Sequence, residues 1–88
     1  MSLFSKLFGG KKQEVEPEDY QGYRIYAAPM AEGGVFRIAA RIEKEVAGEM
    51  RSHQLIRADT LNSKAEAEAA SIAKAKAMID QLGEALFD

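Results

Sequence analysis

Residues 36–42 alternate between apolar and basic or small side chains, and this pattern constrains the fold more than any other feature of the chain. One parity holds Phe36, Ile38, Ala40 and Ile42, and the other holds Arg37, Ala39 and Arg41. A period of two is typical of a β-strand with one face in a core and the other in water. We therefore predict a half-buried strand with its arginines on an open face.

The chain has 88 residues and no cysteine, which limits what it can be. A chain of this length forms one domain at most and buries only about 60% of the surface of its unfolded form. Disulfides and thiolate metal sites are excluded. No apolar run reaches the roughly 18 residues of a membrane span, and the N-terminus lacks the pattern of a signal peptide. We expect a cytoplasmic protein.

The first 19 residues predict a flexible N-terminal segment followed by a charged linker. Its apolar side chains share one side of a short helix: Leu3, Phe4, Leu7 and Phe8. Seven residues are too few for a stable isolated helix. Residues 2–8 therefore fray, dock on the domain or on a second copy, or contact a membrane surface. Gly9 and Gly10 end this stretch, residues 11–19 form the linker, and residues 20–88 form the domain.

Three strands are predicted in the domain, over residues 20–28, 35–44 and 49–58. Pro29 ends the first strand, because proline has no N–H to donate to a β-ladder. Gly33 and Gly34 form the first turn, and residues 46–48 form the second. Connections this short join antiparallel neighbours.

The third strand has the poorest alternation. Arg51, His53, Leu55 and Arg57 share one parity, which we assign to the open face; Met50, Ser52, Gln54, Ile56 and Ala58 share the other, which we assign to the core. Two polar residues on the core parity indicate an edge strand, or a bulge that shifts the register.

A helix is predicted over residues 64–82. Ser63 and Glu66 have the spacing of a capping box, in which the serine hydroxyl accepts from the amide three residues on. The apolar stripe consists of Leu61, Ala65, Ile72, Ala75, Ile79 and Leu82, widened by Ala69, Met78 and Leu86. Gly83 is expected to cap the helix C-terminus, with Leu86 and Phe87 folding back. The predicted fold class is α+β: a three-stranded antiparallel meander packed against one long C-terminal helix (β-β-β-α).

No arrangement of catalytic or metal-ligating residues is present in the sequence. His53 is the only histidine, and transition-metal sites need several histidine or cysteine ligands. Glu43, Glu45 and Glu49 flank a turn without the spacing of a calcium loop. We therefore expect no enzyme, no cofactor, no metal and no small-molecule substrate.

The remaining candidate is an arginine-bearing sheet face. By strand parity it holds Arg24, Arg37, Arg41, Arg51 and Arg57, with Tyr26 and His53 among them. Guanidinium groups suit phosphates and guanine edges, which predicts contact with DNA or RNA. Two alternatives remain open. The arginines pair with Glu43 and Glu45 as the ordinary polar face of a sheet, or the face packs against a second copy.

Several stretches of the sequence resemble one family of small proteobacterial proteins. They are S-L-F-S-K-L-F-G-G at 2–10, Y-Q-G-Y-R-I-Y at 20–26, E-G-G at 32–34, R-I-E-K-E at 41–45, H-Q-L-I-R-A-D-T at 53–60 and I-D-Q-L-G-E-A-L-F at 79–87. This is the HlyU family, which carries the name of a transcriptional activator, and the resemblance covers nearly the whole chain. It implies a non-enzymatic transcriptional regulator. The expected β-β-β-α order is also similar to sheet-reading DNA-binding modules and to a double-stranded-RNA-binding domain without its first helix. A homodimeric protein-interaction module is the alternative function.

Overall fold

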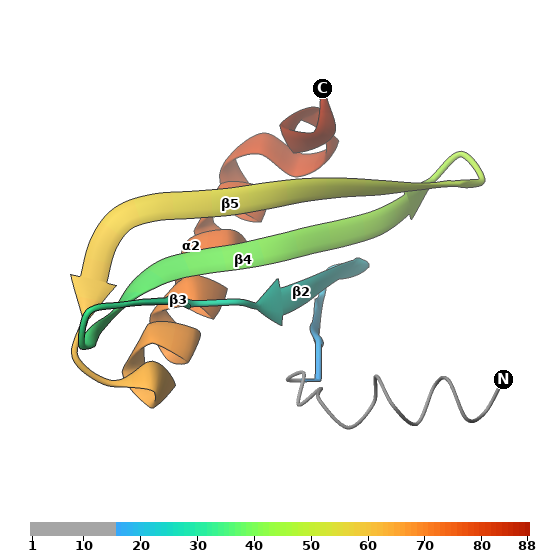
Figure 1. The fold of residues 1–88 in the computed structure, drawn as a ribbon. Helices are drawn as coiled ribbons and strands as arrows, with labels where there is room; N and C mark the ends of the chain where they lie inside the picture. Colours follow the sequence, from blue (N-terminus) through green and yellow to red (C-terminus); the bar gives the residue numbers. More distant parts are fainter. Residues whose placement is uncertain (1–15) are drawn as a thin grey trace, which may run out of the picture.

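A computed structural model describes residues 16–88 and confirms the α+β class, with an antiparallel sheet and one C-terminal helix (Figure 1). The sheet has five strands and not the three predicted. The elements are β1 (Glu18–Tyr20), β2 (Tyr23–Ala27), β3 (Met30–Glu32), β4 (Val35–Val46), β5 (Glu49–Leu61), the helix α2 (Lys64–Leu82) and the 3-10 helix η1 (Gly83–Phe87).

The long strand β4 is the centre of the sheet. β2 and β3 pair with successive parts of one edge of β4, and β5 pairs with its other edge. β1 forms a hairpin with β2 at the outside of the sheet. All of these pairings are antiparallel, as the short connections predict. The helix α2 crosses one face only, so the two faces of the sheet have different surroundings (Figure 1).

The predicted first strand, over residues 20–28, is divided between β1 and β2, and the predicted connection after it contains a further short strand, β3. Gln21 and Gly22 both have positive φ and turn the chain between β1 and β2. The break between β2 and β3 falls at residues 28 and 29, where the sequence has Pro29. β2 and β3 keep the same register on β4, so the two short strands behave as one edge with a break at residues 28–29. The sequence pattern indicated the proline stop but not the continuation beyond it.

A buried serine of the helix supports the sheet at this break. The Ala39 carbonyl accepts from the Ala28 amide at 2.9 Å, while the Ala39 amide donates to Ser71 Oγ at 3.1 Å. Ser71 Oγ in turn donates to the Ala67 carbonyl at 2.6 Å, and its side chain is fully buried. A buried N–H without a partner is costly, so Ser71 replaces the acceptor that an unbroken strand would provide.

The core lies between α2 and the helix-covered face of the sheet. Its most buried large side chains, Ile25 and Ile42, are 0% exposed and lie opposite each other on β2 and β4. The other buried members of the cluster are Tyr23, Ala40, Leu55, Ala75, Ile79 and Leu86. The predicted burial of Ile38, Ala40 and Ile42 is confirmed, and Phe36 is half-buried. Ala39, which we expected on the open side, is also buried.

The helix begins and ends where the sequence predicts. Ser63 Oγ accepts from the Glu66 amide at 3.1 Å, which confirms the serine half of the capping box. At the other end Gly83 has φ +56°, and its N–H donates to the Ile79 carbonyl. Leu86 then returns to the core, and the Phe87 ring stacks on Tyr23 with 6.2 Å between ring centroids.

The buried stripe of α2 differs from the predicted one. It consists of Ala67, Ser71, Ala75 and Ile79, which follow one another at intervals of four residues. Ala65 and Leu82, both placed in the stripe by apolarity, are exposed. The small side chains of this stripe let the helix axis approach the sheet closely. Ser71 is the polar member of the stripe, because its hydroxyl accepts from the Ala39 amide. The stripe predicted from apolar residues alone is therefore rotated around the helix relative to the face that is buried.

The N-terminal end of the described chain is attached to the helix. Tyr20 donates its hydroxyl to Asp80 at 2.8 Å, and this hydrogen bond, with partial burial, raises the Tyr20 pKa. The Lys76 ammonium lies 2.6 Å from the Glu18 carboxylate, and this hydrogen-bonded pair raises the Lys76 pKa. Glu18 and Asp19, which we placed in the linker, thus belong to β1. The predicted segment with Leu3, Phe4, Leu7 and Phe8 lies outside the described residues.

The predicted orientation of the third strand is wrong. In β5 Leu55 lies opposite Ala40, His53 opposite Ile42 and Arg51 opposite Lys44. Cross-strand neighbours share a face, so these odd-numbered residues face the helix side and not the open side. A shift of register opposite Arg37–Ala39 gives β5 extra residues, and β5 pairs only with β4 among residues 16–88, so β5 has the bulge and the edge position that its poor alternation predicts.

Candidate functional site

The open face is the side of the sheet away from α2. Four of the seven predicted site residues lie on it: Arg24, Tyr26, Arg37 and Arg41. Arg24 is opposite Glu43, and Tyr26 is opposite Arg41. The other three residues, Arg51, His53 and Arg57, lie on the helix side, where Arg57 lines a cleft with residues of α2. The structure therefore does not unite the five arginines on one surface.

Arg37 forms a two-pronged ion pair at the β3–β4 hairpin. Its Nε and Nη2 donate to the two carboxylate oxygens of Glu32 at 2.8 and 2.9 Å. These hydrogen bonds lower the Glu32 pKa and raise the Arg37 pKa. Arg37 Nη1 also donates to the Arg57 carbonyl at 3.4 Å, within the bulged part of β5. The guanidinium group is thus already occupied by partners within the fold.

Arg41 is held between a carboxylate and an aromatic ring. Its Nε lies 2.9 Å from Glu43, and its guanidinium carbon lies 4.2 Å from the centroid of the Tyr26 ring. A guanidinium over a ring face is attracted by the ring quadrupole. Arg24 lies on the other side of Tyr26, and a hydrogen bond to that side chain is the largest cause of its raised pKa, with Asp19 and Glu43 adding to it.

The open face carries both signs of charge and has no positive excess. Its three arginines are accompanied by four carboxylates: Asp19, Glu32, Glu43 and Glu45. Over residues 16–88 nine lysines and arginines stand against thirteen aspartates and glutamates, a net charge of −4. Surfaces that bind nucleic acid through phosphates carry an excess of cations. The arrangement is therefore a set of local ion pairs without the excess of cations that is typical of phosphate-binding surfaces.

Exposed apolar side chains are the second property of the open face. Met30 is 44% exposed, Met50 59% and Ile56 51%. They lie opposite Arg37, Glu45 and Ala39, so all three belong to the open face. They are three of the four exposed large hydrophobic residues among residues 16–88. Sequence reasoning missed them because it assigned the Met50 and Ile56 parity to the core.

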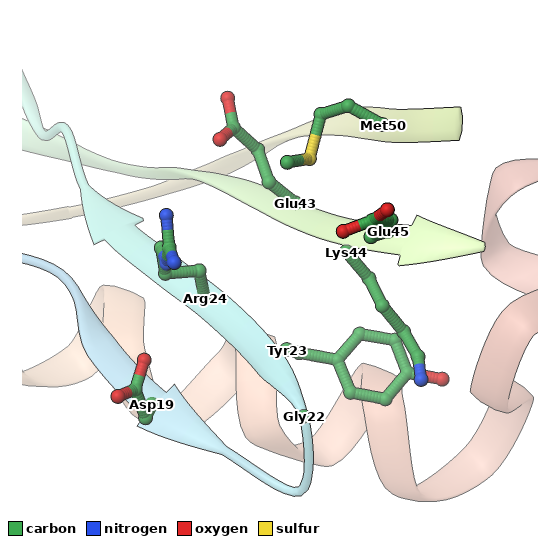
Figure 2. Close-up of a pocket in the computed structure, with 8 residues that line it drawn as sticks. All are labelled: Asp19, Gly22, Tyr23, Arg24, Glu43, Lys44, Glu45 and Met50. Carbon is green, nitrogen blue, oxygen red and sulfur yellow. The ribbon is translucent and has the colours of Figure 1, made fainter. Parts of the chain in front are cut away.

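A shallow hollow lies at the end of the sheet nearest the β1–β2 turn (Figure 2). It has a volume of about 470 Å³ and is lined by Asp19, Gly22, Tyr23, Arg24, Glu43, Lys44, Glu45 and Met50. Three of these side chains are carboxylates and two are cations, so the hollow does not favour an anion. No group of three histidine, cysteine or acidic residues within residues 16–88 has the arrangement of a metal site.

These features define a class of protein. The described residues combine a helix-covered sheet face with an exposed face of mixed charge and apolar side chains, and every buried side-chain polar atom among them has a partner. No helix within residues 16–88 is long and apolar enough to cross a membrane. The described residues therefore form a small α+β domain with one covered and one exposed sheet face.

The family is shown by a comparison with known families. The HlyU family, described as transcriptional activator HlyU, matches residues 2–87. The chain belongs to this family, as the resemblance of the sequence predicts. Its description is that of a transcriptional regulator and not of an enzyme. Searches of the curated proteins and of the solved structures found no significant match.

Proposed function

We propose that the chain is a non-enzymatic transcriptional regulator that works as a homodimer joined through its open sheet face. The observation that carries this proposal is the exposure of Met30, Met50 and Ile56, all on that face. An exposed apolar surface on one side of a small domain favours a partner that covers it. The family description supplies the regulatory role.

The composition of the face fits a protein interface better than a nucleic-acid interface. Methionine, tyrosine and arginine are enriched in protein interfaces, whereas isolated acidic side chains are depleted. Here two of the four acidic groups are paired, Glu32 with Arg37 and Glu43 with Arg41. Pairing within each copy reduces the cost of removing these charges from water when a second surface approaches.

A second copy suits this face because its charges are nearly balanced. Two identical faces with a strong excess of one sign repel each other, but three arginines against four carboxylates leave little excess. The described chain measures 38 × 35 × 18 Å, so its broad side exceeds the roughly 800 Å² per partner of a standard interface. A two-fold dimer with the sheets face to face has the helices on the outside.

Light scattering at several protein concentrations tests this proposal. We expect the wild-type chain to have the mass of a dimer and the Ile56→Glu variant to have that of a monomer, since a buried carboxylate disfavours the interface. Ala73→Glu is the matched control, because Ala73 is exposed on α2. A monomeric wild-type chain at every concentration from micromolar to millimolar contradicts the homodimer.

Direct contact with nucleic acid is the second candidate, and one observation favours it. Within residues 16–88 no carboxylate lies at ion-pair distance from Arg24, and Arg41 beside it is 46% exposed. Arg24, Tyr26, Arg37 and Arg41 form the contact surface in this case. Arg51, His53 and Arg57 lie on the other side of the sheet and do not share it.

Titration of labelled duplex DNA and RNA at low and moderate salt tests the second candidate. Binding through guanidinium groups is strongest at low salt and weakens as salt rises. The Arg24→Glu and Arg41→Glu variants are expected to abolish it, whereas Lys64→Glu, at the exposed start of α2, leaves it unchanged. Absence of binding at micromolar protein and low salt contradicts this candidate. A dimer that buries the open face makes the two candidates mutually exclusive.

A further inference from the structure

β5 is the one long edge strand of the described sheet. It has 13 residues and pairs with β4 along one side, while no strand of residues 16–88 pairs with its other side (Figure 1). A free edge presents backbone N–H and C=O groups that accept a further strand. The question is which kind of strand this edge is suited to bind.

The direction of the free backbone groups follows from the hydrogen bonds of Ala39. Its carbonyl accepts from Ala28, so the polar groups of Ala39 point toward β2 and those of Ala40 point toward β5. Leu55, opposite Ala40, therefore points its N–H and C=O toward β4. The groups of Gln54 and Ile56, on either side of Leu55, point away from the sheet and are available to a partner.

A cleft lies beside this edge, between β5 and α2. It has a volume of about 250 Å³ and is lined by Leu55, Arg57, Lys74, Ala77, Met78, Gln81 and Leu82. Two of the lining side chains are cations and none is a carboxylate. Leu82 is 47% exposed, so the apolar wall of the cleft is also incompletely covered. The cleft thus suits an acidic group next to an apolar one.

The two sides of the free edge differ in chemistry. On the helix side β5 presents His53 and Arg57, with Lys74 of α2 across the cleft. On the open side it presents the exposed apolar Ile56 beside the cleft, and the polar Gln54 and Ser52 separate it from Met50. A strand added to β5 alternates its side chains between these two sides. Beside residues 55–57 its complement is therefore acidic where it faces the cleft and apolar where it lies next to Ile56.

We propose that the free edge of β5 binds an extended segment of a partner protein in which acidic and apolar residues alternate. The acidic side chains face Arg57 and Lys74, and the apolar ones lie beside Ile56. Arg51, nearer the β4–β5 turn, lines a separate hollow with Glu84 and Asp88, so the binding of acidic groups centres on Arg57. Both proposals use Ile56, but the backbone edge and the cleft with Arg57 and Lys74 lie outside the open face, so the two tests change different residues.

A second copy fits this edge poorly. Antiparallel pairing of two β5 strands about Gln54 places Arg57 opposite Arg51, and pairing about Leu55 places it opposite His53. Like charges directly opposite each other destabilise a strand pair. In these two registers the charge of the edge favours a different chain that carries carboxylates, and the register about Ala58, which places Arg57 opposite Asp59, falls within the bulge.

The test uses two fluorescent eight-residue peptides with the full chain, one alternating glutamate with valine and the other alternating lysine with valine. We expect only the glutamate peptide to bind, with salt-dependent affinity. The paired change Arg57→Glu and Lys74→Glu is expected to weaken binding by at least about tenfold. Lys64→Glu is the matched control, because it reverses the charge of an exposed lysine outside the cleft. In NMR spectra the amides of Gln54 and Ile56 are expected to shift.

Three outcomes overturn the proposal. The first is that neither peptide binds or that both bind equally, because the cleft then provides no charge selection. The second is that the double variant, shown to be folded by circular dichroism, binds as well as the wild type. The third is a wild-type oligomer that dissociates on Arg57→Glu, which identifies a second copy as the occupant. Since Arg57 and Lys74 lie outside the open face, a failure here leaves the Ile56→Glu test of the homodimer unaffected.

Discussion

The two faces of the sheet differ in burial and in composition. On the helix side Ile25 and Ile42 are 0% exposed and are covered by α2, whereas on the open side Met50 and Ile56 are more than half exposed. The covered face packs against α2 within one chain, apart from the cleft beside β5. The open face combines arginine–carboxylate pairs with exposed apolar side chains, and this composition is typical of protein interfaces. We therefore expect stability to depend on the first face, and we propose that binding uses the second.

The largest expected effect comes from replacing the same residue type on the two faces. Ile42→Ala leaves a cavity under α2 and is expected to destabilise the fold by about 2–5 kcal/mol. Ile56→Ala, on the open face, is expected to change the stability by less than about 0.5 kcal/mol. Urea unfolding at a protein concentration low enough to keep the chain monomeric measures both. Similar losses in the two variants contradict the separation of the faces.

The next effect concerns the support that the helix gives to the broken edge of the sheet. Ser71→Ala leaves the buried Ala39 amide without its acceptor, and we expect a loss of about 1–3 kcal/mol. Ser52→Ala, at an exposed position of β5, is the control and is expected to be nearly neutral. Amide hydrogen exchange at Ala39 gives a local readout. Unchanged protection of that amide in Ser71→Ala contradicts the role assigned to the serine.

A smaller effect is expected at the start of α2, which covers the core face. Ser63→Ala removes the acceptor for the Glu66 amide and is expected to cost about 1 kcal/mol. Ser63→Asp retains an acceptor at this position and is expected to keep most of the stability. Thermal unfolding of the two variants beside the wild type provides the measurement. Equal melting temperatures of Ser63→Ala and the wild type count against the cap.

The smallest effect belongs to the open face and depends on pH. The hydrogen bonds from Arg37 lower the pKa of Glu32, so the pair stabilises the fold above the pKa of glutamate in the unfolded chain. This contribution is lost as the pH falls through the lowered pKa of the folded state. Glu32→Gln is expected to flatten this part of the acid dependence slightly, because the pair is exposed. Melting curves over the acidic range of pH measure it, and a steeper dependence in Glu32→Gln has the wrong sign.

Much of the fold was predictable because local signals and tertiary packing agree. The Ser63 cap, the Gly83 end and the alternation of Ile38, Ala40 and Ile42 depend on neighbours within a few residues. The division of the predicted first strand was harder to predict from the sequence. The turn at Gln21 and Gly22 lies within a run that otherwise alternates like one strand, and its positive φ at a glutamine has no strong sequence signal.

The candidate site was predicted only in part. Arg24, Tyr26, Arg37 and Arg41 lie together as expected, because β2 and β4 alternate clearly. Arg51, His53 and Arg57 were assigned to the wrong side, since their polarity was read as exposure to water on the open face. They are accessible for another reason, because β5 lies at the edge of the sheet and the helix leaves a cleft beside its outer side.

The sequence by itself determined the class of the fold, the bounds of the helix and the inward face of the central strand. Those features follow from hydrogen bonds and alternation within single segments. Only the tertiary structure decided which side of β5 packs under α2, which carboxylate holds each arginine and which helix residue meets the Ala39 amide. These depend on the register between strands and on the approach of the helix, and a shift of one residue in that register reverses the face of every side chain in a strand.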